Sequence, residues 1–313
     1  TQLGNIPTLY VPDRIEEGYG PNIEAMETLA NVHDLIICVD CGTLSHETIN
    51  KITNTDIIIL DHHLGGETLP NAYAVVNPNR QDEKGDLYYL CAAGVVFLTL
   101  VAANSIRRNN NKSTPDLLNM LDLVALGTVA DVAPLIGFNR ALVRQGLKVM
   151  AKRERIGITA LSDIAKMNNA PSPYHLGYLL GPRINAGGRV GKADLGIRLL
   201  TCKNFDEANS IADKLNQLND ERRSIEATVQ LQALEQVEKM GSNSALVWAA
   251  GEGWHPGVVG IVASRIKEIT NKPTVVIGLD EHEGKGSGRS ISGIDLGSSI
   301  ATLQRENLII RGG

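Results

Sequence analysis

The feature that most restricts the fold of this sequence is a long stretch, Asp206 to Met240, that contains neither glycine nor proline. Apolar residues recur within it every three or four positions, at Ala208, Ile211, Leu215, Leu218, Ile225 and Val229. This spacing is typical of an amphipathic helix. Such a helix would be on the order of 50 Å long at a rise of about 1.5 Å per residue, far longer than most helices in globular proteins. We therefore expect it to connect two domains, with residues 1–204 before it, residues 205–240 in the helix and residues 241–313 after it.

The residues before this helix predict an α/β domain. Leu35–Val39 and Ile57–Leu60 are continuous apolar runs rich in isoleucine and valine. Such runs are typical of strands that are buried on both faces, as in a parallel sheet covered by helices. Further strands are expected at Pro7–Pro12 and Ala74–Val76, and helices at Asn22–Asn31, Ala92–Asn104 and Leu117–Val129. Alternation of this kind favours an α/β fold.

The residues after the long helix predict a second, smaller α/β domain. Strands are expected at Ala245–Ala250 and Thr274–Ile277. Helices are expected at Val258–Glu268 and Leu296–Arg305.

The overall charge argues against binding to duplex DNA through bulk electrostatics. The 313 residues carry a formal net charge of −5, whereas proteins that bind nucleic acid in this way are normally basic. Any site for a polyanion must therefore be local, built from a few arginines or from metal ions. No apolar run approaches the roughly 18–20 residues that span a bilayer, and nothing at the start indicates export, so we expect a cytoplasmic protein with no membrane contact.

Cysteine usage indicates thiols that are buried and reduced. Cys38 and Cys41 have the C-x-x-C spacing of a zinc or redox pair, and Cys91 and Cys202 are isolated. No second pair and no nearby His-x-x-x-His segment completes a zinc site. Free cysteine is among the most frequently buried residue types.

Carboxylates and histidines follow two of the expected strands. Asp40 comes directly after Val39, and Asp61, His62 and His63 come directly after Leu60. Ligands of open parallel sheets gather at the carboxyl ends of the strands, and this mixture of oxygen and imidazole ligands suits Mn²⁺ or Mg²⁺. A third aspartate, Asp131, should lie in a turn, because Pro134 ends the preceding helical run. Taken singly, each aspartate could instead be a helix cap or a turn residue.

Several segments resemble those of one protein family. Asp61-His62-His63 after an apolar strand resembles the motif that gives the DHH phosphoesterases their name, and Cys38–Gly42 and Gly127–Pro134 are similar to two further aspartate motifs of that family. Val11–Gly20, Val75–Arg80 and Gly181–Arg189 resemble segments of its RecJ-type exonucleases. Gly253–Ala263 and Gly286–Ser290 resemble the DHH-associated substrate-binding domain. The resemblance covers essentially the whole chain, in order.

The resemblance implies a site with two divalent metal ions, Mn²⁺ or Mg²⁺. Asp40, His62 and Asp131 would be metal ligands, Asp61 would bind metal or orient its neighbours, and His63 would hold a ligand or meet the scissile phosphate. Asp61, His62 and His63 are thus the expected catalytic residues. The family's first metal motif, Asp-x-Asp, is expected upstream of Thr1, and its Gly-rich, His-containing motif after Gly313. We therefore expect these 313 residues alone to be nearly inactive.

Phosphate groups of a substrate would be bound mainly by arginine, whose planar guanidinium donates two parallel hydrogen bonds. The candidates in Gly-rich segments are Arg14, Arg183, Arg189 and Arg289. Ser287 and Ser290 are expected to form an anion-binding nest of backbone N–H groups, and His255 precedes a helix start, where a phosphate is favoured. Trp254 could stack on a base, but core packing is the favoured interpretation.

The function implied by the resemblance is hydrolysis of single-stranded DNA from its 5′ end, in DNA repair and recombination. The expected partners are single-stranded DNA, a single-strand-binding protein and a helicase. The alternatives are another DHH phosphoesterase (an oligoribonuclease, a cyclic-dinucleotide hydrolase or a pyrophosphatase) or a non-catalytic replication scaffold derived from the family. Retention of Asp40, His62, His63 and Asp131 favours an enzyme.

Overall fold

A computed structural model describes residues 4, 6–13, 17–241, 244–281, 283–310 and 312 of the chain. The chain divides into two compact units. Unit 1 comprises Thr1–Gly188 and Lys192–Asn216, and unit 2 comprises Arg189–Gly191 and Gln217–Gly313. The expected long helix is present as α9 (Phe205–Met240), and its residues belong to both units.

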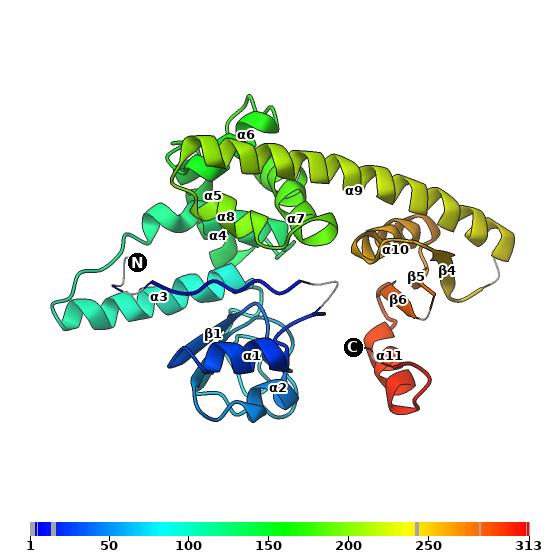
Figure 1. The fold of residues 1–313 in the computed structure, drawn as a ribbon, viewed down its shortest axis with the longest axis horizontal. Helices are drawn as coiled ribbons and strands as arrows, with labels where there is room; N and C mark the ends of the chain where they lie inside the picture. The colour runs from blue at the N-terminus through cyan, green and yellow to red at the C-terminus, as the bar shows by residue number, and fades with distance from the viewer. Residues whose placement is uncertain are drawn as a thin grey trace. The chain divides into compact units, whose positions relative to one another are not determined.

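Unit 1 begins with a parallel sheet in the order β1 (Leu35–Val39), β2 (Asp56–Leu60) and β3 (Ala74–Val76). One face of the sheet is covered by α1 (Ile23–Ala30) and α2 (His46–Lys51) (Figure 1). The core on this face contains Met26 and Ala30 of α1, Ile49 of α2, and Ile36, Cys38, Ile57 and Ile59 of the strands. Helix α1 begins at Ile23 because the Asn22 side chain accepts a hydrogen bond from the backbone N–H of Ala25.

The opposite face of the sheet is covered unevenly. Leu60 of β2 packs with Leu90 and with Val95 of α3 (Ala92–Asn109). On β1, by contrast, alternate residues point away from the core, and Leu35, Ile37 and Val39 are each about half exposed. Strand β1 is also an edge strand of the described sheet. This face of β1 is therefore an uncovered apolar surface.

The rest of unit 1 is helical. Its elements are η1 (Leu118–Met120), α4 (Leu121–Ala130), α5 (Gly137–Met150), α6 (Ile156–Ile164), the π-helix η2 (His175–Leu180), α7 (Gly181–Val190), whose last residues fall in unit 2, α8 (Leu195–Thr201) and the first part of α9. Helices α4 and α5 approach each other closely at Gly146, where an added Cβ would lie 2.1 Å from the backbone oxygen of Leu121. Helix α4 is apolar on nearly every side and is accordingly buried.

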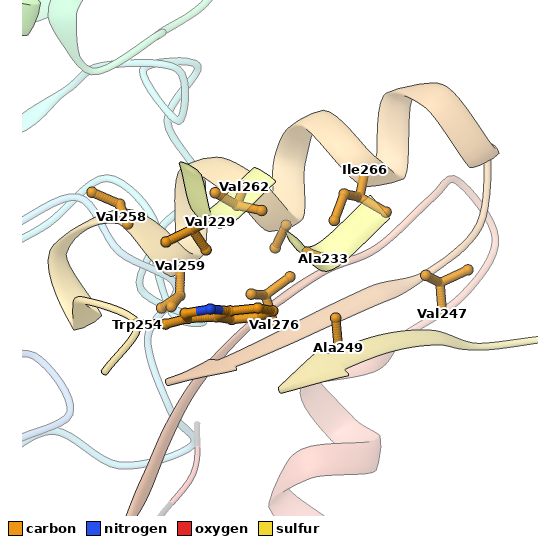
Figure 2. Packing of buried hydrophobic residues seen from close by; sticks show 11 residues of the cluster. Val229, Ala233, Val247, Ala249, Trp254, Val258, Val259, Val262, Ile266 and Val276 are labelled. Atoms are coloured by element: carbon orange, nitrogen blue, oxygen red, sulfur yellow. The ribbon is translucent and has the colours of Figure 1, made fainter. Parts of the chain in front are cut away.

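Unit 2 is a three-stranded sheet packed on helices. Strands β4 (Val247–Glu252) and β5 (Thr274–Leu279) are parallel, and β6 (Gly284–Arg289) is antiparallel to β5. Helices α10 (Pro256–Thr270) and α11 (Leu296–Arg305) complete the unit. The core combines strand residues with Val258, Val262 and Ile266 of α10 and with Val229 and Ala233 of α9 (Figure 2).

Trp254 belongs to this core. Its side chain is only 6% exposed, and its ring lies beside Val259 and Val276 (Figure 2). The indole Nε1 donates a hydrogen bond of 2.6 Å to Oε1 of Gln232, so the one polar atom of the ring is satisfied. The expectation that Trp254 packs in the core is confirmed.

The predicted fold class is confirmed, with local corrections. The strand expected at Pro7–Pro12 is wrong, since residues 6–13 are irregular. Two prolines there remove backbone donors that a sheet would need. The four cysteines are free, but only Cys38 and Cys91 are fully buried, whereas Cys41 and Cys202 are partly exposed. Within the described part of the chain, no helix is both long and apolar enough to cross a membrane.

Candidate functional site

Two aspartates lie side by side at the carboxyl edge of the unit 1 sheet. The backbone N–H of Asp40 donates to the oxygen of Leu60 at 2.9 Å, and that of Asp61 donates to the oxygen of Val76 at 3.1 Å. The parallel pairing thus continues one residue beyond β1 and β2. Asp40 then takes a left-handed conformation, with φ of 64°. A non-glycine residue in this region is uncommon and is concentrated at functional sites.

His62 brings three parts of unit 1 together. Its Nε2 atom lies 3.1 Å from Oδ1 of Asp40, which follows β1, and 3.6 Å from Oδ2 of Asp131. Asp131 is the C-cap of α4 and lies in a turn, as the sequence predicts. Residues separated by up to 91 positions in the sequence, from Asp40 to Asp131, therefore meet at one imidazole.

The neighbouring charges shift the pKa values of His62 and Asp131. The hydrogen bond that Asp40 accepts from His62 raises the pKa of His62, and the negative charge of Asp131 raises it further, while burial lowers it. Burial raises the pKa of Asp131, and the nearby Asp40 charge adds to it, while His62 lowers it. A positive charge between the carboxylates of Asp40 and Asp131 is therefore favourable, whether it is supplied by a proton on His62 or by a bound cation.

The donor atoms at this point fit a divalent metal ion. One ligand atom each from Asp40, His62 and His63 lies within 4.8 Å of the others. Asp131 adds a carboxylate oxygen 3.6 Å from His62. Carboxylate oxygens together with imidazole nitrogens are suitable ligands for Mn²⁺ and similar ions.

Asp61 has a different environment from the other aspartates. It is only 1% exposed. Its Oδ1 accepts a hydrogen bond from the backbone N–H of His62 at 2.8 Å and contacts Nδ1 of His63 at 2.7 Å, while its Oδ2 accepts from the backbone N–H of Thr43 at 3.1 Å. Burial would raise the pKa of Asp61, but the hydrogen bonds from Thr43, His63 and His62 lower it to about 2. Both oxygens of Asp61 are thus engaged in orienting its neighbours.

Two asparagines that sequence reasoning did not single out support the histidines. Asn77 donates to Oγ1 of Thr43 at 2.9 Å and to the backbone oxygen of His63 at 2.8 Å. Asn79 donates to the backbone oxygen of His62 at 2.6 Å. Both asparagines lie in the Val75–Arg80 segment, so that motif was the signal that could have identified them. Such outer contacts fix the orientation of metal ligands.

The predicted phosphate-binding residues of unit 1 are only partly described. Arg14 lies outside the described residues. Arg183, in α7, donates from Nε to Oδ1 of Asn216 at 2.9 Å and from Nη1 to the backbone oxygen of Leu179 at 2.8 Å. Its side chain is therefore held between η2 and the first part of α9.

In unit 2, Arg289 is an exposed cation that contacts the hydroxyl groups of two serines. It is the last residue of β6, and it donates from Nε to Oγ of Ser264 at 3.1 Å and from Nη1 to Oγ of Ser287 at 3.0 Å. An added Cβ on Gly260 of α10 would lie 3.1 Å from Nη2 of Arg289. Among the described residues, no carboxylate pairs with Arg289.

Two further candidates meet at the start of α10. His255 is the N-cap of the helix, and its Nδ1 accepts a hydrogen bond from the backbone N–H of Gly257 at 3.0 Å. Arg189 donates from Nη1 to the backbone oxygen of Gly257 at 3.0 Å.

The anion-binding nest expected around Ser287 and Ser290 stays a prediction. Ser287 lies within strand β6, where it pairs with Val276 of β5. The Ser290 hydroxyl donates to the backbone oxygen of Ile294 at 2.6 Å. Strand β6 is an edge strand of the described sheet, so the backbone groups on its outer side are not paired with another strand.

Comparison with known proteins finds similarity along nearly the whole chain. The profile of the DHH family, N-terminal domain, matches residues 3–128, and that of the DHHA1 domain matches residues 242–307. The single-stranded-DNA-specific exonuclease RecJ of Salmonella typhimurium is 40% identical over 311 residues, which cover 94% of this chain and 54% of that protein. RecJ of Bacillus subtilis is 37% identical over 302 residues, which cover 93% of this chain and 37% of that protein.

Solved structures show the same similarity in three dimensions. A crystal structure of exonuclease RecJ bound to manganese superposes with a TM-score of 0.81 and 32% identity, covering 97% of this chain and 75% of that chain. RecJ from Thermus thermophilus in complex with Mn²⁺ gives a TM-score of 0.79 and 32% identity, covering 93% of this chain and 43% of that chain. The chain spans about half the length of the Salmonella relative.

Proposed function

Because this chain belongs to the RecJ family of DHH proteins, we propose that it is the catalytic part of a metal-dependent exonuclease that hydrolyses single-stranded DNA from the 5′ end. The observation that carries the proposal is the meeting of Asp40, His62 and Asp131 at one imidazole nitrogen, with contacts of 3.1 and 3.6 Å. The biological process would be DNA repair and recombination, in which a single strand is shortened from one end.

Two divalent ions, Mn²⁺ or Mg²⁺, are the proposed cofactors. Asp40, His62 and Asp131 would hold them, because their oxygen and nitrogen atoms already converge. When bound, such ions stabilise the negative charge that develops on the oxygens of a phosphodiester during hydrolysis.

The remaining residues of the site would position these ligands and the substrate. Asp61 fixes the orientation of His63 through the 2.7 Å contact to its Nδ1. The other ring nitrogen of His63 then remains for a ligand or for the scissile phosphate. We propose that Asp61 orients rather than binds metal, since both of its oxygens already accept hydrogen bonds.

Phosphate groups of the strand would be bound by the arginines. Arg289 offers an exposed guanidinium held by Ser287 and Ser264, and its Nη2 is the guanidinium nitrogen nearest Gly260. Arg189 and His255 meet at the first turn of α10, where the positive end of the helix dipole favours an anion. Arg183 and Arg14 are proposed to act from unit 1.

The proposal extends to domains, partners and location. Residues 1–204 would form the DHH domain, residues 205–240 the connecting helix and residues 241–313 the DHH-associated domain. A single-strand-binding protein and a helicase would supply the single strand, and the cytoplasm would be the compartment.

The proposal is tested with DNA carrying a label at one end. A protein that contains residues 1–313 with the flanking segments of its longer relatives is incubated with a single strand, a duplex and a dinucleotide, with Mn²⁺, Mg²⁺ or EDTA. We expect metal-dependent release of mononucleotides from the 5′ end of the single strand only. Cleavage restricted to dinucleotides would instead indicate another DHH phosphoesterase, and an absence of cleavage together with an absence of Mn²⁺ binding would indicate a scaffold.

A further inference from the structure

Two tyrosines form an exposed stacked pair on unit 1. The rings of Tyr174 and Tyr178 have centroids 5.1 Å apart with an interplanar angle of 26°. The side chains are 61% and 71% exposed, so they contribute little to the core. A single exposed aromatic residue needs no explanation, but a stacked pair is unusual in a chain with only 4% aromatic residues.

The rings are held by one another and by a histidine. His175 lies edge-on to Tyr174, with centroids 5.9 Å apart. The His175 Nδ1 atom is in turn 3.0 Å from the hydroxyl of Ser172. Among the described residues, neither tyrosine hydroxyl has a hydrogen-bond partner. The pair is thus fixed in position while its outer faces and hydroxyl groups remain available.

The segment that carries the pair packs on the helix that precedes Asp131. Tyr178 follows Gly177, whose added Cβ would lie 3.4 Å from Cγ1 of Val129, and the added Cβ of Gly181 would lie 3.3 Å from Cβ of Ala130. Val129 and Ala130 are the two residues before Asp131. The segment η2 therefore packs directly on the end of α4 that presents this carboxylate. π-helices are rare and are found frequently at functional sites.

An arginine that follows the pair in the sequence contacts the same segment. Arg183 donates to the backbone oxygen of Leu179, the residue after Tyr178, at 2.8 Å. Sites for single-stranded nucleic acid commonly combine a cation that attracts phosphate with aromatic rings that stack on unpaired bases.

We propose that Tyr174 and Tyr178 form a stacking platform for unpaired bases of the DNA strand, on the segment η2 that packs against the end of α4. The inference rests on the proposed function, since the bases are those of the same strand. Stacking on an aromatic face is tolerant of sequence, because every base has such a face. The platform binds bases only when they are unpaired, and it therefore contributes to selection of single strands over duplex.

The experiment compares two ligands that differ only in their bases. Binding of a fluorescent oligodeoxythymidylate and of an abasic strand of equal length is measured by anisotropy for the parent, for Tyr174→Ala with Tyr178→Ala, and for Tyr174→Phe with Tyr178→Phe. Tyr73→Ala is the matched control, because Tyr73 is 75% exposed and no ring stacks on it within the described part of the chain.

We expect the loss of affinity to depend on the bases of the strand. The double alanine variant should bind oligodeoxythymidylate about 5- to 100-fold more weakly, the range typical of one lost stacking contact, with unchanged affinity for the abasic strand. The phenylalanine variant and Tyr73→Ala should bind like the parent. Strands that contain 5-iodouracil should crosslink to Tyr174 or Tyr178 in the parent.

Other outcomes overturn the inference. Equal weakening toward both strands would indicate a general structural role for the tyrosines, and no weakening would show that they do not contact bases. In either case, 5′-end hydrolysis by the parent would leave the proposed function intact. A parent protein that neither binds nor hydrolyses single-stranded DNA would instead remove the proposed function, and the platform with it.

Discussion

Replacement of Gly146 by alanine tests how closely α4 and α5 pack. The added Cβ would lie 2.1 Å from the backbone oxygen of Leu121 and 2.6 Å from Cβ of Ala125, both in α4. Ordinary contacts between such atoms are about 3.5–4 Å, so the two helices must separate by roughly 1 Å or more. Overpacking of a core costs typically about 1–3 kcal/mol, and a clash with backbone on a rigid helix should lie at the upper end.

The opposing effect is smaller. Alanine is favoured over glycine in a helix by about 1 kcal/mol. We therefore expect Gly146→Ala to lower the free energy of unfolding by about 2 kcal/mol. Because α4 also carries Asp131, separation of the helices should also weaken Mn²⁺ binding.

A second glycine provides the matched control. Gly188 lies within α7, and an added Cβ there would meet no atom within 4 Å. Gly188→Ala should therefore raise the free energy of unfolding, by about 0.4–1 kcal/mol, through the reduced entropy of the unfolded chain. Urea denaturation measures both variants. An unfolding midpoint of Gly146→Ala at or above that of the parent would refute the close helix packing, since the same substitution would then have the same sign at both positions.

Three further predictions concern the sites. Asp40→Ala and His62→Ala should each reduce Mn²⁺ affinity at least about tenfold in titration calorimetry; an unchanged affinity would exclude that residue from the metal site. Arg289→Ala should reduce the salt dependence of single-strand binding by about one in the log–log slope, and an unchanged slope would move the phosphate contact to Arg183, Arg189 or His255. In the metal-free protein, the pKa of Asp61 is lowered from 3.8 to about 2, so ionised Asp61 stabilises the fold above about pH 4, and this contribution is lost as pH falls toward about 2. The free energy of unfolding of Asp61→Asn, measured in urea, should lack this dependence on acid pH. An equal change of the unfolding free energy with pH in both proteins would contradict the prediction.

The strands and the long helix could be predicted because their patterns are local. The apolar run Leu35–Val39 and the helical stripe within Phe205–Met240 each depend on residues that are near in sequence, and both elements formed at nearly the expected bounds. Pro7–Pro12 shows the limit of this reasoning. Its apolar composition suggested a strand, but strand formation requires a hydrogen-bonded neighbour, which composition does not specify.

The site was predictable as a set of residues but not as a geometry. The ends of β1 and β2 had to lie together once the sheet was parallel, so Asp40 and His62 could be paired from sequence. The position of Asp131 depends on how α4 packs on the rest of unit 1, and that packing depends on contacts such as the one at Gly146. The roles of Asn77 and Asn79 depend on hydrogen bonds across loops. No spacing rule encodes either kind of contact.

The uncovered face of β1 has a consequence for the behaviour of the purified chain. Leu35, Ile37 and Val39 present apolar side chains on an edge strand whose backbone groups lack a neighbour on one side within the described sheet. Such edges are templates for strand addition by other molecules. Concentrated solutions of the chain should therefore self-associate, and sedimentation velocity should show the associated fraction growing with concentration. Ile37→Lys would place a charge in the middle of that edge and should keep the chain monomeric.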